Sequence, residues 1–181
     1  MNPLTPTLVN AIANKSTPHI SHIFNHIHYI NRKNKDDHGN IENFQDDLCK
    51  ALNSQNQTPG YKWYKEYKIN STKIVVPQRF IGVDDSVDIL GHGGDNDPIC
   101  IIEIDASRAD QVAKKILSRT ALFGLLHPII YVSLMYPDTQ KGFNQCIKHI
   151  NYGKSVIESI NPNSEVVGIY LELNTQSYTI I

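Results

Sequence analysis

The sequence predicts a single α/β domain in which a mixed central sheet is flanked by helices. Segments with helical periodicity alternate with short apolar segments along most of the 181 residues. Two apolar segments are joined by the turn-rich stretch GHGGDNDP, which indicates an antiparallel hairpin. A third, PIIYVSLMY, is apolar throughout, as is typical of a strand buried on both faces. This length suits one well-packed domain and is short for two.

The N-terminal part predicts a helical extension, residues 1–38, ahead of the α/β domain at residues 39–181. Apolar residues recur there at helical spacing, the pattern breaks at Thr17, and the segment ends in the charged run NRKNKDDHG. Asn40 is expected to cap the next helix, whose apolar face runs through IENFQDDLCKALNSQ.

The centre of the chain predicts two or three antiparallel strands. Residues 61–69, YKWYKEYKI, have the composition of a strand or strand edge. Residues 71–83 are expected to be extended, with Pro77 marking an edge or a bulge. SVDIL at 86–90 and ICIIEID at 99–105 form the two arms of the hairpin.

Helices and strands alternate in the second half of the chain. Residues 108–126 and 140–160 have amphipathic helical patterns, whereas residues 128–136 and 165–174 predict strands. The order is therefore helix, antiparallel strands, helix, strand, helix, strand. Such an order places helices on both faces of a mixed sheet.

Three acidic residues of the hairpin are expected to converge. If Leu90 pairs with Ile101, an antiparallel register puts Asp88 opposite Glu103. Because side chains alternate between the two faces, Asp88, Glu103 and Asp105 would then share one face. Isolated carboxylates are costly in an apolar strand, so this predicts a positive partner among them: an arginine, a lysine or a metal ion.

Charge and composition narrow the functional classes. The net charge of −1 argues against a strongly basic nucleic-acid binder, yet residues 61–83 carry five basic residues and one acid. Residues 84–110 carry eight acids and one arginine. An acidic centre beside a basic segment suits a cation site next to a polyanion groove, with ordinary solvated faces as the alternative.

The chain also predicts a cytoplasmic protein without a membrane partner. No apolar run approaches the roughly 18 residues that span a bilayer. The N-terminus lacks the basic and apolar regions of a secretory signal. Three widely spaced cysteines, each in a periodic apolar segment, are typical of reduced core thiols.

The element order, with Asp88 in SVDIL and the triplet Glu103-Ile104-Asp105 in IIEID, resembles the PD-(D/E)XK nuclease superfamily. The resemblance covers residues 40–174 by element order, and its specific motif is these few positions. It implies a restriction-endonuclease-like core and Mg²⁺, or alternatively Mn²⁺, as the cofactor. By this resemblance Asp88 and Glu103 would be the metal ligands, with the Ile104 carbonyl as a further one. Asp105, which shares their face, is expected to join them as a third acidic ligand. A hard divalent cation of this kind activates water and polarises a phosphodiester near neutral pH.

The sequence departs from the family at Asp105, where most members have a lysine that orients the attacking water. Asp105 can bind a metal or accept a proton, but it cannot supply positive charge. Lys115 on the following helix is therefore expected to face the acids and to act with them in catalysis. Arg108 is expected near a phosphate.

The resemblance implies double-stranded DNA as the partner and a homodimeric, type II restriction-type endonuclease acting on a palindromic site. The candidate DNA-binding residues are Lys62, Lys65, Lys68, Arg79 and Arg108. The aromatic residues among these lysines form either a nucleic-acid surface or part of a half-buried strand: Tyr61, Trp63, Tyr64 and Tyr67.

Several weaker patterns leave alternatives open. His22 and His26 have a spacing that can hold zinc, but without a third ligand nearby they fit polar positions of an amphipathic helix. Glu42 or Glu66 could add an acid to the metal site, whereas Glu42 also suits the first turn of a helix. The alternatives to a nuclease are a non-catalytic member that binds nucleic acid or protein, and an α/β protein whose carboxylates are only ion-paired.

Overall fold

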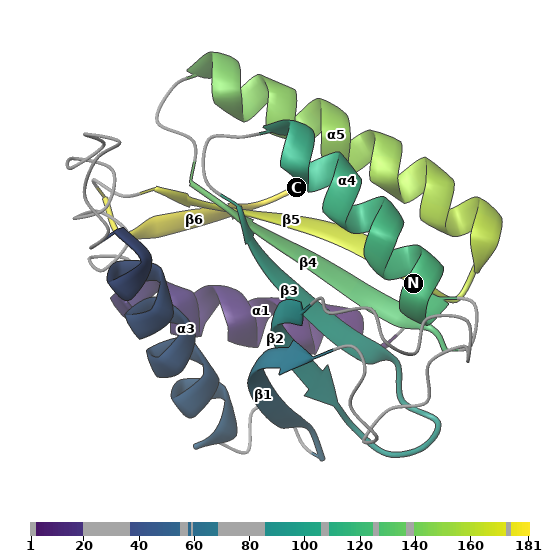
Figure 1. Ribbon diagram of the computed structural model, residues 1–181, viewed down its shortest axis with the longest axis horizontal. Coiled ribbons are helices and arrows are strands. Elements are labelled where there is room, and N and C mark those ends of the chain that lie inside the picture. Colours follow the sequence, from purple (N-terminus) through teal and green to yellow (C-terminus); the bar gives the residue numbers. More distant parts are fainter. Residues whose placement is uncertain are drawn as a thin grey trace.

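A computed structural model shows an α/β protein, whose described residues form a six-stranded mixed sheet with four helices packed against it (Figure 1). The structure describes residues 3–19, 37–54, 58, 60–68, 86–105, 109–124, 127–136, 140–172 and 175–181. The predicted α/β class and mixed sheet are therefore confirmed.

The helices and strands follow one another in the predicted alternation. The helices are α1 (Thr5–Ser16), α3 (Asp37–Asn53), α4 (Ala109–Arg119) and α5 (Gln140–Ile160), with one 3-10 turn (Thr17–His19) and one π turn (Thr120–Gly124). The strands are β1 (Lys62–Lys68), β2 (Ser86–His92), β3 (Ile99–Asp105), β4 (Ile129–Met135), β5 (Glu165–Glu172) and β6 (Ser177–Ile180).

The six strands lie in the sheet in sequence order, from β1 to β6. β1, β2 and β3 form an antiparallel meander, β3, β4 and β5 are parallel, and β6 returns antiparallel to β5. Leu90 pairs with Ile101, so the predicted register of the hairpin is confirmed. α4 and α5 supply the crossovers that parallel strands require.

Two apolar cores lie on the two faces of the sheet. One core packs α1 and α3 against β3 residues Cys100, Ile102 and Ile104, and the other packs α4 and α5 against Ile99 and Ile101. Figure 1 shows the two helix pairs on opposite sides of the sheet. Because side chains alternate along a strand, the next two residues of the second row, at positions 103 and 105, face α4.

Helix α4 is placed against α5 by a close contact at a glycine. A Cβ on Gly153 would lie 2.6 Å from Ile116 Cδ1, so any side chain at this position would require the Ile116 side chain to shift. Val112 and Ile116 are fully buried on the inner side of α4. Lys115 follows Val112 by three residues, and Arg119 follows Ile116 by three. Lys115 and Arg119 therefore lie next to each other on one side of α4.

The structure differs from the sequence predictions in two element ends, in the packing of α1 and in one additional strand. α3 begins at Asp37, ahead of the expected cap Asn40, so the boundary predicted between residues 38 and 39 lies within a helix. Leu8 of α1 belongs to the core beneath the sheet. β2 continues to His92, so the turn is shorter than expected, and β6 was not predicted.

Some predictions concern residues that lie outside the described ones. They are the extended segment 71–83, the two basic residues Arg79 and Arg108, and the paired histidines His22 and His26. None of the helices in the described part of the chain has the length and hydropathy that crossing a bilayer requires.

Candidate active site

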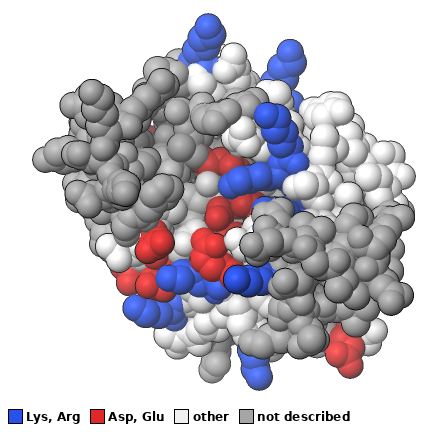
Figure 2. All heavy atoms as spheres, in the orientation of Figure 1, with Lys and Arg blue, Asp and Glu red and all other residues white. Residues whose placement is uncertain are grey.

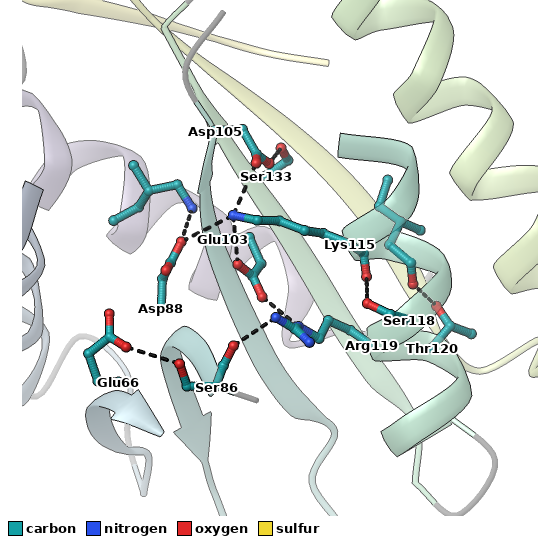
Figure 3. A network of polar contacts seen from close by, with 12 residues as sticks. Glu66, Ser86, Asp88, Glu103, Asp105, Lys115, Ser118, Arg119, Thr120 and Ser133 are labelled. Atoms are coloured by element: carbon teal, nitrogen blue, oxygen red, sulfur yellow. Dashed lines mark hydrogen bonds and ion pairs between the residues drawn. The ribbon is translucent and has the colours of Figure 1, made fainter. Parts of the chain in front are cut away.

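Lys115 lies at the centre of the three predicted carboxylates (Figure 3). Its Nζ is 3.0 Å from Glu103 Oε2, 3.2 Å from Asp105 Oδ1 and 3.5 Å from Asp88 Oδ2. β2, β3 and α4 therefore bring the four side chains to one point. The predicted convergence of the acids and the predicted direction of Lys115 are confirmed, whereas their roles in catalysis and metal binding stay predictions.

Glu103 is held in place by an arginine that the sequence reasoning missed. Arg119 Nε donates to Glu103 Oε1 at 2.7 Å, and Arg119 Nη2 donates to the Ser86 carbonyl at 2.7 Å. The Glu103 and Arg119 side chains are 1% and 6% exposed, so this is a dry ion pair. One Glu103 oxygen is thus fixed by Arg119, and the other is directed at Lys115.

Asp105 and Asp88 follow the same pattern. Ser133 Oγ donates to Asp105 Oδ2 at 2.8 Å, which leaves Oδ1 for Lys115. Gln45 Nε2 donates to Asp88 Oδ1 at 3.2 Å, and Oδ2 faces Lys115. Each carboxylate therefore has one oxygen bound by an outer group and one that points at a common centre.

The backbone of β3 also contacts Asp88. Beyond the pair formed by Ile89 and Ile102, the Ile104 N–H donates to Asp88 Oδ2 at 2.7 Å. The N–H and C=O of one strand residue point to the same neighbouring strand. The Ile104 carbonyl, implied as a further metal ligand, is therefore directed toward β2 as well.

The cluster has a deep side and an open side. The side chains of Glu103 and Asp105 are buried, whereas those of Asp88 and Lys115 are 22% and 27% exposed. Acidic atoms are visible near the middle of this face, with Lys and Arg atoms beside them (Figure 2). Among the described residues, the ion pairs of the cluster set three carboxylates against two cations, Lys115 and Arg119, and so leave one negative charge without a described counter-ion.

Burial raises the pKa values of the two buried carboxylates, Glu103 and Asp105. Burial, reinforced by the Asp88 carboxylate, raises the pKa of Glu103 from about 4.5 to about 7 against the attraction of Lys115 and Arg119. Burial also raises the pKa of Asp105. Burial alone would lower the pKa of Lys115, but the three carboxylates outweigh it and raise that pKa, so Lys115 is a cation.

The raised pKa of Glu103 predicts a pH-dependent stability. Between pH 4.5 and 7 the folded protein keeps a proton on Glu103 that the unfolded chain releases. The Glu103 contribution to the free energy of unfolding therefore falls as the pH rises through this window. We expect the wild type to lose stability relative to Glu103→Gln, by about 1–3 kcal/mol, between these pH values. Urea denaturation of both proteins at several pH values checks this, and a pH-independent difference would contradict it.

The oxygen atoms of the cluster suit a hard divalent cation, but the Lys115 ammonium lies at the position that such a cation would take. The three N···O distances of 3.0–3.5 Å exceed the Mg–O distance of about 2.1 Å. As arranged, the described residues include no group of three or more His, Cys, Asp or Glu side chains that could hold a metal ion.

A buried acceptor beside Asp88 fits a hydrated cation. Gln45 is 2% exposed, and its Oε1 has no hydrogen-bond partner within the described part of the chain. A water molecule of a hydrated cation next to Asp88 would be a suitable donor, since Mg²⁺ usually keeps several waters. The donor set therefore fits Mg²⁺ once the Lys115 side chain moves.

The candidate DNA-binding lysines differ in their surroundings. Lys62 and Lys68 are exposed on β1, whereas Lys65 Nζ lies 2.8 Å from Asp46 Oδ1. Lys68 pairs with Ser86 at the end of the sheet that carries the carboxylates, and Lys62 pairs with His92 at the opposite end. Of these three, Lys68 is exposed at the carboxylate end of the sheet.

Three of the four aromatic residues proposed as a nucleic-acid surface at β1 are buried, so that alternative is wrong for them. Tyr61, Trp63 and Tyr67 are 8%, 3% and 5% exposed, so they cannot stack on bases. Of the two candidate extra acids, Glu42 is exposed on α3 and Glu66 accepts a hydrogen bond from Ser86 Oγ. The ion pairs of Lys115 described above involve neither Glu42 nor Glu66.

Sequence signals existed for the three missed residues. Arg119 follows Lys115 by four residues on the same helix, and Ser133 is a small polar residue in an otherwise apolar strand. Gln45 lies beside Phe44 on the apolar side of its helix. A polar residue on a buried face is expected to have a partner, and here each partner is one of the carboxylates.

Comparisons of the chain with protein-family models, with curated proteins and with solved structures gave no match.

Proposed function

We propose that the chain is a Mg²⁺-dependent DNA endonuclease with a restriction-endonuclease-like core. The observation that carries the proposal is the pattern of the three carboxylates: each has one oxygen bound by an outer partner and one directed at a shared centre. An ion pair needs only one carboxylate, whereas three oriented ones suit a divalent cation. The element order α3-β1-β2-β3-α4-β4 supports the same proposal.

The proposed roles follow from the position of each group. Asp88, Glu103 and Asp105 would hold the cation, with Mn²⁺ as an alternative to Mg²⁺. The cation supplies charge that polarises the phosphodiester and lowers the pKa of water. Lys115 would stabilise the negative charge that develops on the phosphate. As the alternative to holding the cation, Asp105 would accept a proton from the attacking water.

The proposed substrate is duplex DNA, bound by a homodimer in the manner of a type II restriction enzyme. Lys68 lies at the site end of β1, where a phosphate next to the scissile one would pass. Because Lys65 is already paired with Asp46, its contribution to this surface would be the smallest of the three lysines.

A salt titration tests the DNA surface. We expect Lys68→Ala to lower affinity for all duplexes alike and to reduce the slope of log K against log salt by about 0.9, because a phosphate contact is lost. Lys62→Ala should have a smaller effect, and Lys154→Ala, at the far end of α5, should have none. Labelled duplexes titrated in Ca²⁺ at several salt concentrations check this. Equal effects of Lys68→Ala and Lys154→Ala would contradict it.

Plasmid cleavage tests the proposed function itself. Supercoiled plasmids and genomic DNA of several sequences are incubated with the wild type in Mg²⁺, in Mn²⁺ and in EDTA. Cleavage that requires the divalent cation is expected. Absence of cleavage of every DNA in both metals would contradict the proposal.

A second candidate function is a non-catalytic module that binds nucleic acid or protein on the same scaffold. The observation that favours it is the closed network, in which Lys115 and Arg119 already neutralise most of the acidic charge. Duplex binding that is independent of Ca²⁺, together with an absence of cleavage, is the outcome expected of this alternative.

A further inference from the structure

We propose that Lys115 is an exchangeable internal counter-ion: a divalent cation enters the carboxylate cluster only as the Lys115 ammonium leaves it. The proposal rests on the proposed function and concerns how the same site is loaded. In Figure 3 the Lys115 side chain extends from α4 across to all three carboxylates.

The two cations cannot occupy the cluster together. Lys115 Nζ lies within 3.5 Å of one oxygen of each carboxylate. Arg119 and Ser133 bind the other oxygens of Glu103 and Asp105, whereas Asp88 Oδ2 also accepts a hydrogen bond from the Ile104 N–H. A divalent ion bound to the same oxygens at about 2.1 Å would lie almost at the Nζ position. Repulsion between two cations so close together is too large for both to stay.

The geometry assigns the exchange to Lys115 and not to Arg119. Arg119 is 6% exposed at its side chain and is held by both Glu103 and the Ser86 carbonyl. Lys115 is 27% exposed and has a flexible four-carbon stem, so its ammonium can reach solvent without a change in the core. The neighbouring Ile116 remains fully buried and keeps the helix in place.

The exchange would also place positive charge where the substrate arrives. Asp88 and Lys115 form the exposed side of the cluster. An ammonium that leaves the three carboxylates stays at this opening, because its backbone is fixed on α4. Metal binding would thus free the Lys115 ammonium to face the phosphate. Asp105 cannot take this role because it carries no positive charge.

Amine labelling of the wild type tests the exchange without a substitution. Lysines are acylated with a water-soluble amine reagent in EDTA and in Ca²⁺, and modification of each lysine is followed by mass spectrometry. Lys115 acylation is expected to rise about tenfold or more in Ca²⁺, because the ammonium loses its three ion pairs. Acylation of the exposed Lys114 on the same helix should change by less than about twofold, since it lies outside the cluster.

Calorimetry with a substitution tests the same competition from the side of the metal. Lys115→Met should bind Ca²⁺ about tenfold or more tightly than the wild type, and Lys114→Met should match the wild type. If Lys115→Met does not fold without a cation, the labelling experiment alone decides.

The outcomes separate this proposal from the proposed function. Ca²⁺ binding with unchanged Lys115 acylation, or with equal affinity of Lys115→Met and wild type, would overturn the exchange and leave the metal-dependent nuclease standing. Exchange without DNA cleavage would support the counter-ion role and overturn the nuclease. Absence of Ca²⁺ binding to the wild type and to both variants would overturn both.

Discussion

Glu103→Gln is expected to lower the rate of Mg²⁺-dependent DNA cleavage by about 10³-fold or more. A metal ion stabilises the transition state by several kcal/mol, and each 1.36 kcal/mol changes the rate about tenfold. Glu103 is the most deeply placed carboxylate, and Arg119 already binds one of its two oxygens. The amide is nearly isosteric, and its oxygen can still accept the hydrogen bond from Arg119 Nε, so the variant should keep its fold. Because the amide carries no charge, the variant should lose its affinity for the metal. Single-turnover cleavage of plasmid at several Mg²⁺ concentrations measures this effect.

The matched control for this prediction is Glu158→Gln. Glu158 is exposed near the end of α5, away from the cluster, and its substitution by glutamine removes the same charge. Its cleavage rate should stay within about twofold of the wild type, as for most exposed substitutions. A Glu103→Gln protein that is folded and cleaves within tenfold of the wild-type rate would remove Glu103 from the catalytic site.

Arg119→Met is expected to lower the free energy of unfolding by about 3–5 kcal/mol, because it leaves Glu103 buried without its closest cation. Glu103 and Arg119 are 1% and 6% exposed, so water cannot replace the lost contact. Lys114→Met removes a positive charge from the exposed side of the same helix and should change stability by less than about 0.5 kcal/mol. Urea denaturation of the three proteins measures the difference.

The double variant Arg119→Met/Glu103→Gln distinguishes a lost ion pair from lost packing. If the cost arises from an uncompensated charge, removing the carboxylate as well should recover most of the stability. If the double variant is as unstable as Arg119→Met alone, the contribution of Arg119 is mainly its packing and its hydrogen bond to the Ser86 carbonyl.

Hydrophobic periodicity was sufficient to predict most of the fold. The strand at Ile99–Asp105 and the helix at Gln140–Ile160 have the predicted ends, because their patterns are long and bounded by turn residues. The edge strand Ser177–Ile180 was missed because its polar–apolar alternation covers only four residues and none of them is fully buried, so the pattern is too short to distinguish it from a loop. The earlier start of α3 at Asp37 shows the usual uncertainty of helix ends.

The convergence of the site was predictable because it depends on local register. Asp88 and Glu103 lie on adjacent strands of one hairpin, so their relation follows from the turn. The outer partners could not be placed in this way. Gln45, Arg119 and Ser133 reach the carboxylates from α3, α4 and β4, and the contacts depend on how these elements pack.

The central claim is that the three carboxylates form a divalent-cation site, and diffraction from crystals soaked in Mn²⁺ tests it most directly. An anomalous difference peak is expected between Asp88, Glu103 and Asp105, at about 2.2 Å from their inner oxygens, with the Lys115 ammonium moved toward solvent. Crystals in which Lys115 remains among the carboxylates at high Mn²⁺ concentration, with no peak at that position, would contradict the claim and identify the cluster as an ion-pair network.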